Sequence, residues 1–375
     1  MQMNTSEPTG RVDNRSSELF EANMNFLNIF KQIKSETCGE ELDEVIEHLV
    51  GKIDDDDFFS KRLRTVSYSI GTMNRIVDEG DTEKMVKIWD ALQVRGIEKI
   101  GEAAASRPNV KAILIAGPSS SGKTTFSKKL SRALEKNGMT AHCISFDDYY
   151  VDRERTPLDE NGEYDYESLY AVDIDLFQRH FAQLLAGEEI ELPRYDFVSG
   201  KRVKSGKFLR LHSDTILIME GIHALNHILT GSIPDEALFR IYISGLTVAK
   251  QHDGTYRPTT DNRLIRRMVR DAQFRGTSAQ ATLARWPSVR RGEDKWIVPF
   301  QQNADINFCT AFQYELAVLK TQALPLLEKV PKESPEYTEA QRLKWVLQRF
   351  HTIPADLIPA DSLLREFIGG SVFEY

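Results

Sequence analysis

One short run of residues has the spacing that phosphate binding requires. Gly117-Pro118-Ser119-Ser120-Ser121-Gly122-Lys123-Thr124 fits the pattern G-x-x-x-x-G-K-[ST], and Thr125 follows it. The two glycines allow a tight turn in which successive backbone N–H groups converge on phosphate oxygens, and Lys123 adds a full positive charge. A helix that begins here would add a partial positive charge. The run therefore predicts a nucleoside-triphosphate site in which residues 117–125 bind ATP.

The segments around this P-loop have the hydrophobic patterns that the motif needs. Residues 110–116 are an apolar run typical of a buried strand, and residues 124–134 carry apolar side chains at helical spacing. Further strands are expected over residues 140–146, 215–219, 239–243 and 304–308, and helices over residues 173–185, 259–274 and 313–327. Strands that alternate with helices predict an α/β fold, here a P-loop kinase fold with a doubly wound, mainly parallel sheet.

Two acidic residues follow two of these strands, where ligands of doubly wound sheets bind. Asp147 comes directly after residues 140–146, and Glu220 comes directly after residues 215–219. Each acid alone could be a helix N-cap, but phosphoryl transfer needs a hydroxyl and a carboxylate for magnesium and a group that orients the attacking oxygen. We expect Thr124 and Glu220 to hold Mg²⁺, directly or through water, and Asp147 to activate a substrate hydroxyl.

Arginines are concentrated between Lys250 and Lys295 in a chain that is acidic overall. They are Arg257, Arg263, Arg266, Arg267, Arg270, Arg275, Arg285, Arg290 and Arg291. Arg263, Arg266, Arg267 and Arg270 recur at i, i+3, i+4 and i+7, so a helix would place them on one face. Arginine suits multidentate phosphate recognition, and the pattern predicts a helical lid over residues 250–295, with Arg266 catalytic beside Lys123 and Asp147. The other interpretation is a solvated cationic helix face.

Length and composition bound the remaining possibilities. The chain has 375 residues and a formal net charge of −8, which argues against a general nucleic-acid binder. Cys38, Cys143 and Cys309 are widely separated, and no apolar run approaches the roughly 18 residues of a membrane span. We therefore expect a cytoplasmic protein without membrane or nucleic-acid partners.

The expected organisation has four parts. Residues 1–15 are predicted to be a disordered tail, 16–107 a helical N-terminal region, 108–330 the P-loop kinase domain, and 331–375 a helical C-terminal extension. Short helices are expected over residues 17–34, 40–52, 61–78, 82–105 and 338–350. The N-terminal helices are candidates for self-association, which would give a homo-oligomer.

Several longer strings make the chain similar to a known family, the uridine kinase/phosphoribulokinase family. They are Gly117–Phe126, Ile144–Tyr150, Thr156–Asp165, Pro193–Phe197, Asp261–Arg267, Trp286–Glu293 and Leu364–Gly370. The chain most resembles bacterial-type nucleoside (uridine) kinases, whose longer members carry domains related to threonyl-tRNA synthetase before the kinase domain. Residues 1–60 are too short for such domains and lack their histidine-rich motif.

The resemblance implies a role for individual residues of this sequence. By it, Asp147 accepts the proton of a sugar 5′-hydroxyl, Tyr150 and Asp165 line a ribose pocket, and Tyr195 lies beside the nucleobase. Glu220 matches the acid on the magnesium side, and Arg263, Arg266 and Arg267 match lid positions that reach substrate and phosphates, with Arg263 substrate-binding. Human-type uridine-cytidine kinases have a base-reading histidine where this chain has Gly200. The implied activity is transfer of the ATP γ-phosphoryl group to a nucleoside, first uridine and then cytidine, with ATP and Mg²⁺ as cofactors.

Three other functions compete with this interpretation. The acceptor could be another small hydroxyl compound, such as a sugar phosphate or a pantothenate-like alcohol. The chain could also be a nucleotide-binding regulatory protein, although the presence of Lys123, Thr124, Asp147 and Glu220 argues for turnover. A GTPase switch has little support, because Asp159-Glu160-Asn161-Gly162 lies in a polar segment and no N-K-x-D motif follows.

Overall fold

The computed structural model describes residues 66–212, 215–231, 233–250 and 256–374. All of them belong to one compact unit, Ile53–Tyr375. The predicted tail at residues 1–15, the predicted helices over 17–34 and 40–52, and Cys38 lie outside the described residues.

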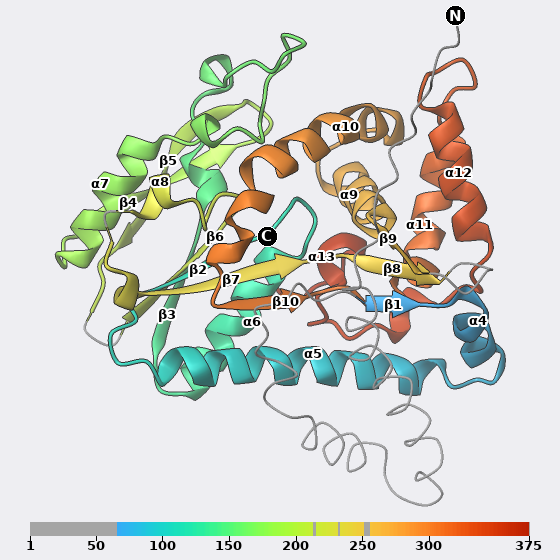
Figure 1. Cartoon of the computed structure of the whole chain (residues 1–375), viewed down its shortest axis with the longest axis horizontal. Helices are drawn as coiled ribbons and strands as arrows, with labels where there is room; N and C mark the ends of the chain where they lie inside the picture. The colour runs from blue at the N-terminus through green and yellow to red at the C-terminus, as the bar shows by residue number, and fades with distance from the viewer. Residues whose placement is uncertain (1–65, 213–214, 232, 251–255, 375) are drawn as a thin grey trace, which may run out of the picture. The chain divides into compact units, whose positions relative to one another are not determined.

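A parallel sheet forms the centre of the described structure (Figure 1). Its strands, in spatial order, are β10 (Ile306–Cys309), β7 (Leu238–Ser244), β2 (Ala112–Ala116), β6 (Thr215–Glu220) and β3 (Thr140–Ser145). Every neighbouring pair of these strands is parallel. The chain leaves the central strand β2 toward the β3 edge first and reaches the β10 edge last, so the sheet is doubly wound. The predicted fold class is confirmed.

The sheet is built from the apolar runs that the sequence predicted. All residues of β2 and β6 are buried, as expected for parallel strands that are covered on both faces. The edge strand β3 is largely exposed along Thr140–Cys143 and is buried only near its end, at Ile144. The core therefore lies around β2, β6 and β7, the three inner strands of the sheet.

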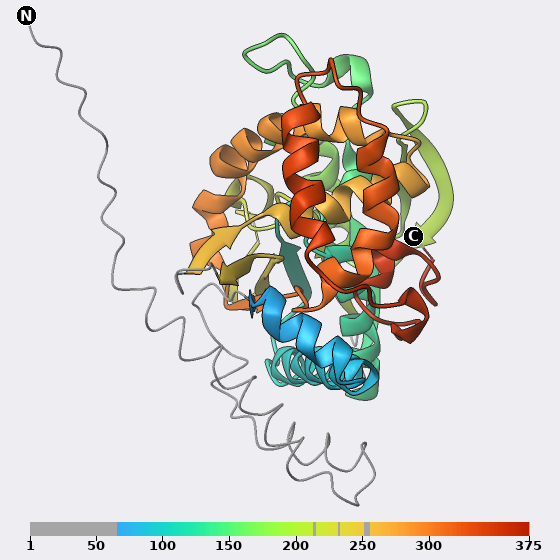
Figure 2. The same ribbon diagram turned by 90° about the vertical axis from the view of Figure 1, so that its right-hand side faces the viewer.

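Helices flank the sheet on both sides (Figure 1). They are α4 (Ile70–Asp78), α5 (Thr82–Ala105), α6 (Lys123–Lys136), α7 (Ile174–Leu185), α8 (His227–Thr230), α9 (Asp261–Phe274), α10 (Ala279–Trp296), α11 (Glu315–Glu328), α12 (Tyr337–Gln348) and α13 (Arg365–Ile368). The long helix α5 packs on α6, which contacts β2, β3 and β6. Helix α9 contacts α10, α11 and α13, and Figure 2 shows α11 beside α12. None of the helices among the described residues combines the length and apolarity of a membrane span.

Some elements differ from the predictions or were not predicted. The helix expected over residues 61–78 begins only at Ile70, because Val66–Tyr68 forms strand β1, which pairs in parallel with β8 (Thr247–Lys250). Strand β9 (Tyr256–Thr259) completes this small sheet in the region predicted as a helical lid. The hairpin of β4 (Ile190–Asp196) and β5 (Lys201–Leu209) was not predicted, because its lysines and arginines obscure the strand pattern.

Candidate active site

The P-loop has the backbone geometry that its two glycines allow. A Cβ at Gly117 would lie 2.2 Å from the Ile243 carbonyl oxygen, so only glycine fits at this close approach of β7. Gly122 has φ +85° and caps α6, and Ser120, at φ +59°, is the non-glycine residue with positive φ among the described residues. Strain of this kind is typical of functional turns. The side chains of Ser120 and Ser121 are buried, and their hydroxyls have no hydrogen-bond partner within the described structure.

The sheet register brings the predicted acids to this turn. Glu220 ends β6 and pairs with Ile115 of β2 on one side and with Ser145 of β3 on the other. The Thr124 hydroxyl donates a hydrogen bond to the Glu220 carboxylate (Oγ1–Oε1 3.2 Å). A P-loop hydroxyl and a carboxylate thus lie together where the parallel strands of the sheet have their C-terminal ends.

The Glu220 carboxyl group is strongly influenced by its surroundings. Burial raises its pKa to about 7, the Lys123 ammonium opposes this rise, and the Asp147 carboxylate adds to it. Both charged side chains therefore act on the Glu220 carboxyl group. No cluster of three or more His, Cys, Asp or Glu side chains in the described parts of the chain is arranged to hold a metal ion. Thr124 and Glu220 can therefore supply only part of a magnesium shell.

Asp147 lies in the short 3₁₀ helix Phe146–Tyr149, directly after β3. Its backbone N–H donates to the Ser145 hydroxyl (3.2 Å), which fixes the turn, and its side chain is only partly buried. A partly exposed carboxylate at the end of β3 can accept a proton from a hydroxyl held there.

Glu167 is a buried carboxylate that the sequence analysis did not identify. It is 9% exposed, and one carboxylate oxygen, Oε2, has no hydrogen-bond partner in the described structure. Burial raises the pKa of Glu167 to about 7, which the Arg267 guanidinium opposes, and both Lys123 and Asp147 also act on it. Asp165 fixes the backbone of Glu167, because the Asp165 carboxylate accepts the Glu167 N–H (3.2 Å). Glu167 follows the string that ends at Asp165, and this position was its only sequence signal.

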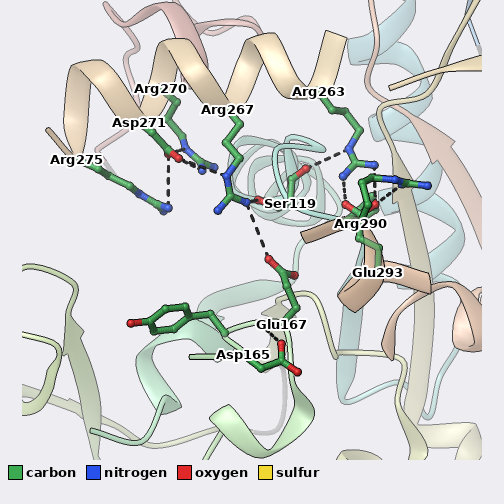
Figure 3. Close-up of polar contacts among 12 residues, drawn as sticks. Ser119, Asp165, Glu167, Arg263, Arg267, Arg270, Asp271, Arg275, Arg290 and Glu293 are labelled. Carbon is green, nitrogen blue, oxygen red and sulfur yellow. Dashed lines mark hydrogen bonds and ion pairs between the residues drawn. The ribbon is translucent and has the colours of Figure 1, made fainter. Parts of the chain in front are cut away.

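Two arginines of α9, Arg263 and Arg267, reach the P-loop from the side opposite Glu167 (Figure 3). The Arg267 guanidinium donates to the Ser119 hydroxyl (2.7 Å) and lies 3.9 Å from the Glu167 carboxylate. The Arg263 guanidinium donates to the Ser119 carbonyl oxygen (Nε–O 3.1 Å). The predicted helix face therefore contacts the phosphate-binding turn through a serine.

Arg263 is nevertheless buried rather than open to a substrate. It is 1% exposed and forms an ion pair with Glu293 of α10, and Glu293 also pairs with Arg290. Arg270 and Arg275 both pair with Asp271 of the same helix. These acidic partners were not predicted, because a single sequence does not show which charges meet.

Arg266, which was predicted to reach the phosphates, lies in the core of this structure. The Arg266 side chain is fully buried; its guanidinium donates to the Thr310 carbonyl oxygen (2.9 Å) and forms an ion pair with Glu315 (2.6 Å). The Thr310 hydroxyl in turn bonds to the Ser121 carbonyl oxygen of the P-loop. Arg266 is therefore connected to the P-loop through Thr310. Its position on α9 directs its side chain toward Glu315 of α11.

Aromatic side chains gather beside Asp147, where the acceptor pocket was predicted. Tyr150 and Tyr195 are buried and meet edge to face, with ring centroids 5.6 Å apart, and Phe197 lies 5.2 Å from Tyr195. The Tyr150 hydroxyl donates to the Tyr166 carbonyl oxygen (3.3 Å). The structure thus brings Tyr150 and Tyr195 together, as a shared pocket requires.

Gly200 has a structural explanation at the turn of the β4–β5 hairpin. Its φ is +71°, and a Cβ there would lie 2.6 Å from the guanidinium of Arg153. That guanidinium donates to the Phe197 carbonyl oxygen (2.8 Å), and its charge acts on the neighbouring Tyr195 hydroxyl. Arg153 therefore occupies the space that a side chain at position 200 would need.

Comparison with known proteins agrees with this geometry. The family described as Phosphoribulokinase / Uridine kinase matches residues 112–316 of the chain. The chain belongs to this family. The matched residues include the P-loop, Asp147, Glu220 and the arginines of α9, so the protein is a kinase-type phosphotransferase.

Individual relatives have related names. A uridine kinase of Staphylococcus aureus (strain JH9) is 31% identical over 193 residues, which are 51% of this chain and 84% of that protein. The solved structure of a possible uridine kinase from Bacillus stearothermophilus is 26% identical, with a TM-score of 0.33, and covers 39% of this chain and 78% of its own. A D-glycerate 3-kinase from Cryptococcus neoformans is 14% identical, with a TM-score of 0.32, over 73% of this chain and 88% of its own.

Proposed function

We propose that this kinase-family protein transfers the γ-phosphoryl group of ATP to the 5′-hydroxyl of a nucleoside, with uridine as the first candidate and cytidine as the second. The observation that carries the proposal is the hydrogen bond of the Thr124 hydroxyl to Glu220 at the edge of the sheet where Asp147 follows β3, close to the aromatic contact of Tyr150 and Tyr195.

The P-loop fits the phosphates of ATP. The helix α6 directs its N-terminus at this turn, and Lys123 supplies a positive charge. Thr124 and Glu220 would hold Mg²⁺, which neutralises phosphate charge when it is bound. Arg267, placed on Ser119 at the same turn, is the lid residue best situated to contact the phosphates.

The acceptor would lie between Asp147 and the aromatic side chains. Asp147 is the proposed base for the 5′-hydroxyl, Glu167 and Asp165 are carboxylates that accept hydrogen bonds from sugar hydroxyls, and Tyr195 offers a flat apolar surface to the base. Arg153, which occupies the space beside Gly200, would donate to a carbonyl oxygen of a pyrimidine.

Arg153 also favours a second acceptor class. A guanidinium beside the pocket would recognise an anionic group, so a sugar phosphate is the alternative acceptor.

A screen for acceptor-dependent ADP formation tests the proposal. Purified protein with ATP and Mg²⁺ is offered uridine, cytidine, ribose 5-phosphate and pantothenate, and the phosphorylated product is identified by mass. We expect uridine to stimulate ADP formation and to yield the 5′-monophosphate. Stimulation by ribose 5-phosphate alone would favour the sugar-phosphate alternative. ATP binding without stimulation by any acceptor would favour a regulatory protein.

A further inference from the structure

A carboxylate from outside the family-matched residues contacts the phosphate-binding turn. Glu366 lies in α13, and its Oε2 accepts hydrogen bonds from the Thr125 N–H (3.0 Å) and from the Thr125 hydroxyl (2.8 Å). The Glu366 side chain is 8% exposed. An internal anion is thus bonded to the first turn of α6, although the family match ends at residue 316.

The Thr125 N–H is one of the donors that a P-loop offers to phosphates. The first four N–H groups of a helix have no partner within that helix, and in a P-loop they converge on nucleotide phosphates. Thr125 is the third residue of α6, after Lys123 and Thr124. Glu366 offers this donor an anionic oxygen, as a phosphate would. A phosphate at the same donor would therefore be opposed by a like charge at close range.

The segment around Glu366 is fixed by contacts that do not involve its carboxylate. Asp361 forms an ion pair with Lys129 of α6 (2.8 Å), and the Phe367 ring lies 4.8 Å from the guanidinium of Arg266. The Gln322 side chain donates to the Ile368 carbonyl oxygen (3.2 Å). The backbone of the segment is therefore held independently of the Glu366 carboxylate.

The charge of Glu366 also reaches the proposed magnesium side of the site. Burial is the main cause of the raised pKa of Glu220, and the carboxylate of Glu366 adds to it. Glu366 therefore lies within the electrostatic environment of the phosphate-binding residues.

We propose that Glu366 is a built-in competitor of the nucleotide phosphates, which occupies the Thr125 donors in the nucleotide-free protein and is displaced when ATP binds. The inference rests on the proposed function, because it assumes that the P-loop binds ATP. Its consequence is that the C-terminal segment weakens nucleotide binding, so that the affinity is lower than the P-loop alone would give.

Glu366→Gln separates the charge of this side chain from its shape. Glutamine keeps an oxygen that accepts from Thr125 but carries no charge, so ATP should displace it more easily. We expect the Kd of ATP, measured by isothermal titration calorimetry of the full chain, to fall about threefold to tenfold. Inorganic tripolyphosphate, which has no nucleoside, should show the same change.

Asp356→Asn is the matched control, since it removes an exposed carboxylate of the same C-terminal segment, and its Kd for ATP should stay within about twofold of the wild type. An unchanged or weaker affinity of Glu366→Gln would overturn the proposal and make Glu366 a positioning residue. A variant that does not unfold cooperatively on heating would also overturn it, because a displaceable group is not needed for folding. Absence of ATP binding by the wild type would contradict the proposed function itself.

Discussion

Asp147 and Asp148 are adjacent carboxylates with different surroundings. Asp147 lies within the field of Lys123 and Glu220, whereas the Asp148 carboxylate accepts the backbone N–H of Tyr195 (3.2 Å). Neighbouring residues in a 3₁₀ turn point in different directions, so one can face a reacting hydroxyl while the other holds the β4 strand. The pair therefore offers an internal control for the role of a base.

Asp147→Asn should lower kcat about 10²-fold to 10⁴-fold, because the amide cannot accept the hydroxyl proton. ATP binding should be retained, since the P-loop residues are unchanged. Steady-state ADP formation with the best acceptor measures kcat, and titration calorimetry measures the Kd of ATP. Asp148→Asn should change kcat less than about tenfold, because that carboxylate positions the backbone of Tyr195. Equal losses in the two variants would argue against Asp147 as the base.

Glu167 makes the stability of the fold depend on pH. Burial raises its pKa from 4.5 to about 7, so between these values the folded state holds a proton that the unfolded state has released. Its contribution to stability is therefore present at low pH and falls as the pH rises through this window. The full effect would be at most about 3.5 kcal/mol, from roughly 1.4 kcal/mol per pKa unit.

Glu167→Gln should make the free energy of unfolding depend less steeply on pH between about pH 5 and pH 8. Part of the slope should remain, because the pKa of Glu220 is also raised to about 7. Urea denaturation at several pH values provides the measurement. Glu160→Gln, which changes an exposed side chain, should leave the dependence as it is in the wild type. If the free energy of unfolding of Glu167→Gln depended on pH as steeply as that of the wild type, the Glu167 carboxyl group would not have the raised pKa.

At the scale of elements, helix α9 is an internal support rather than a surface helix. Arg263 and Arg266 are both buried, and their ion pairs reach α10 and α11 respectively. Among the arginines of α9, it is Arg267 that bonds to a side chain of the P-loop, the Ser119 hydroxyl. The position of α9 therefore determines which of its arginines pair with acids in the core and which contact the P-loop.

Arg266→Ala should destabilise the fold by about 3–5 kcal/mol, because it leaves the Glu315 carboxylate buried without its partner. The midpoint of urea unfolding and its slope measure this loss. Arg275→Ala, at the C-cap of the same helix, is the control, since the Arg275 side chain is 39% exposed and its loss should cost about 1 kcal/mol or less. A stable Arg266→Ala variant with a much lower kcat would restore the original expectation that Arg266 acts on the phosphates.

At the scale of the whole molecule, the end of the chain completes the core around the P-loop helix. Leu363, Leu364 and Phe367 are almost fully buried, and Lys129 of α6 is paired with Asp361. These contacts join α6 and α9 through residues that lie outside the family match. The segment is thus part of the folded kinase unit.

Deletion of residues 359–375 should abolish cooperative unfolding, because it removes several buried side chains worth about 2–5 kcal/mol each from a net stability of roughly 5–15 kcal/mol. Circular dichroism during heating would detect the loss. Deletion of residues 1–15, which the sequence predicts to be disordered, is the control and should leave the unfolding midpoint unchanged. If the protein without residues 359–375 still folded well, the segment would pack on the core without being needed for folding.

The sequence by itself was sufficient to predict the class of fold and the phosphate-binding turn. The turn at Gly117–Thr124 depends on the local conformation of its own residues. The apolar strands around it can be recognised from their composition. Asp147 and Glu220 could be found because parallel strands end at a common edge, and the register confirms that Glu220 lies between β2 and β3. These features depend on neighbours along the chain or on the topology of the sheet.

Only the tertiary structure decided which charged residues meet. Arg266 and Arg267 are adjacent in sequence, yet one lies in the core against Glu315 and the other lies on Ser119 of the P-loop. Glu366 and Thr125 are far apart in the chain but form a hydrogen bond, and nothing local predicts it. The reason is physical: a buried charge must find a partner in space, and that partner is set by the packing of helices rather than by spacing in the sequence.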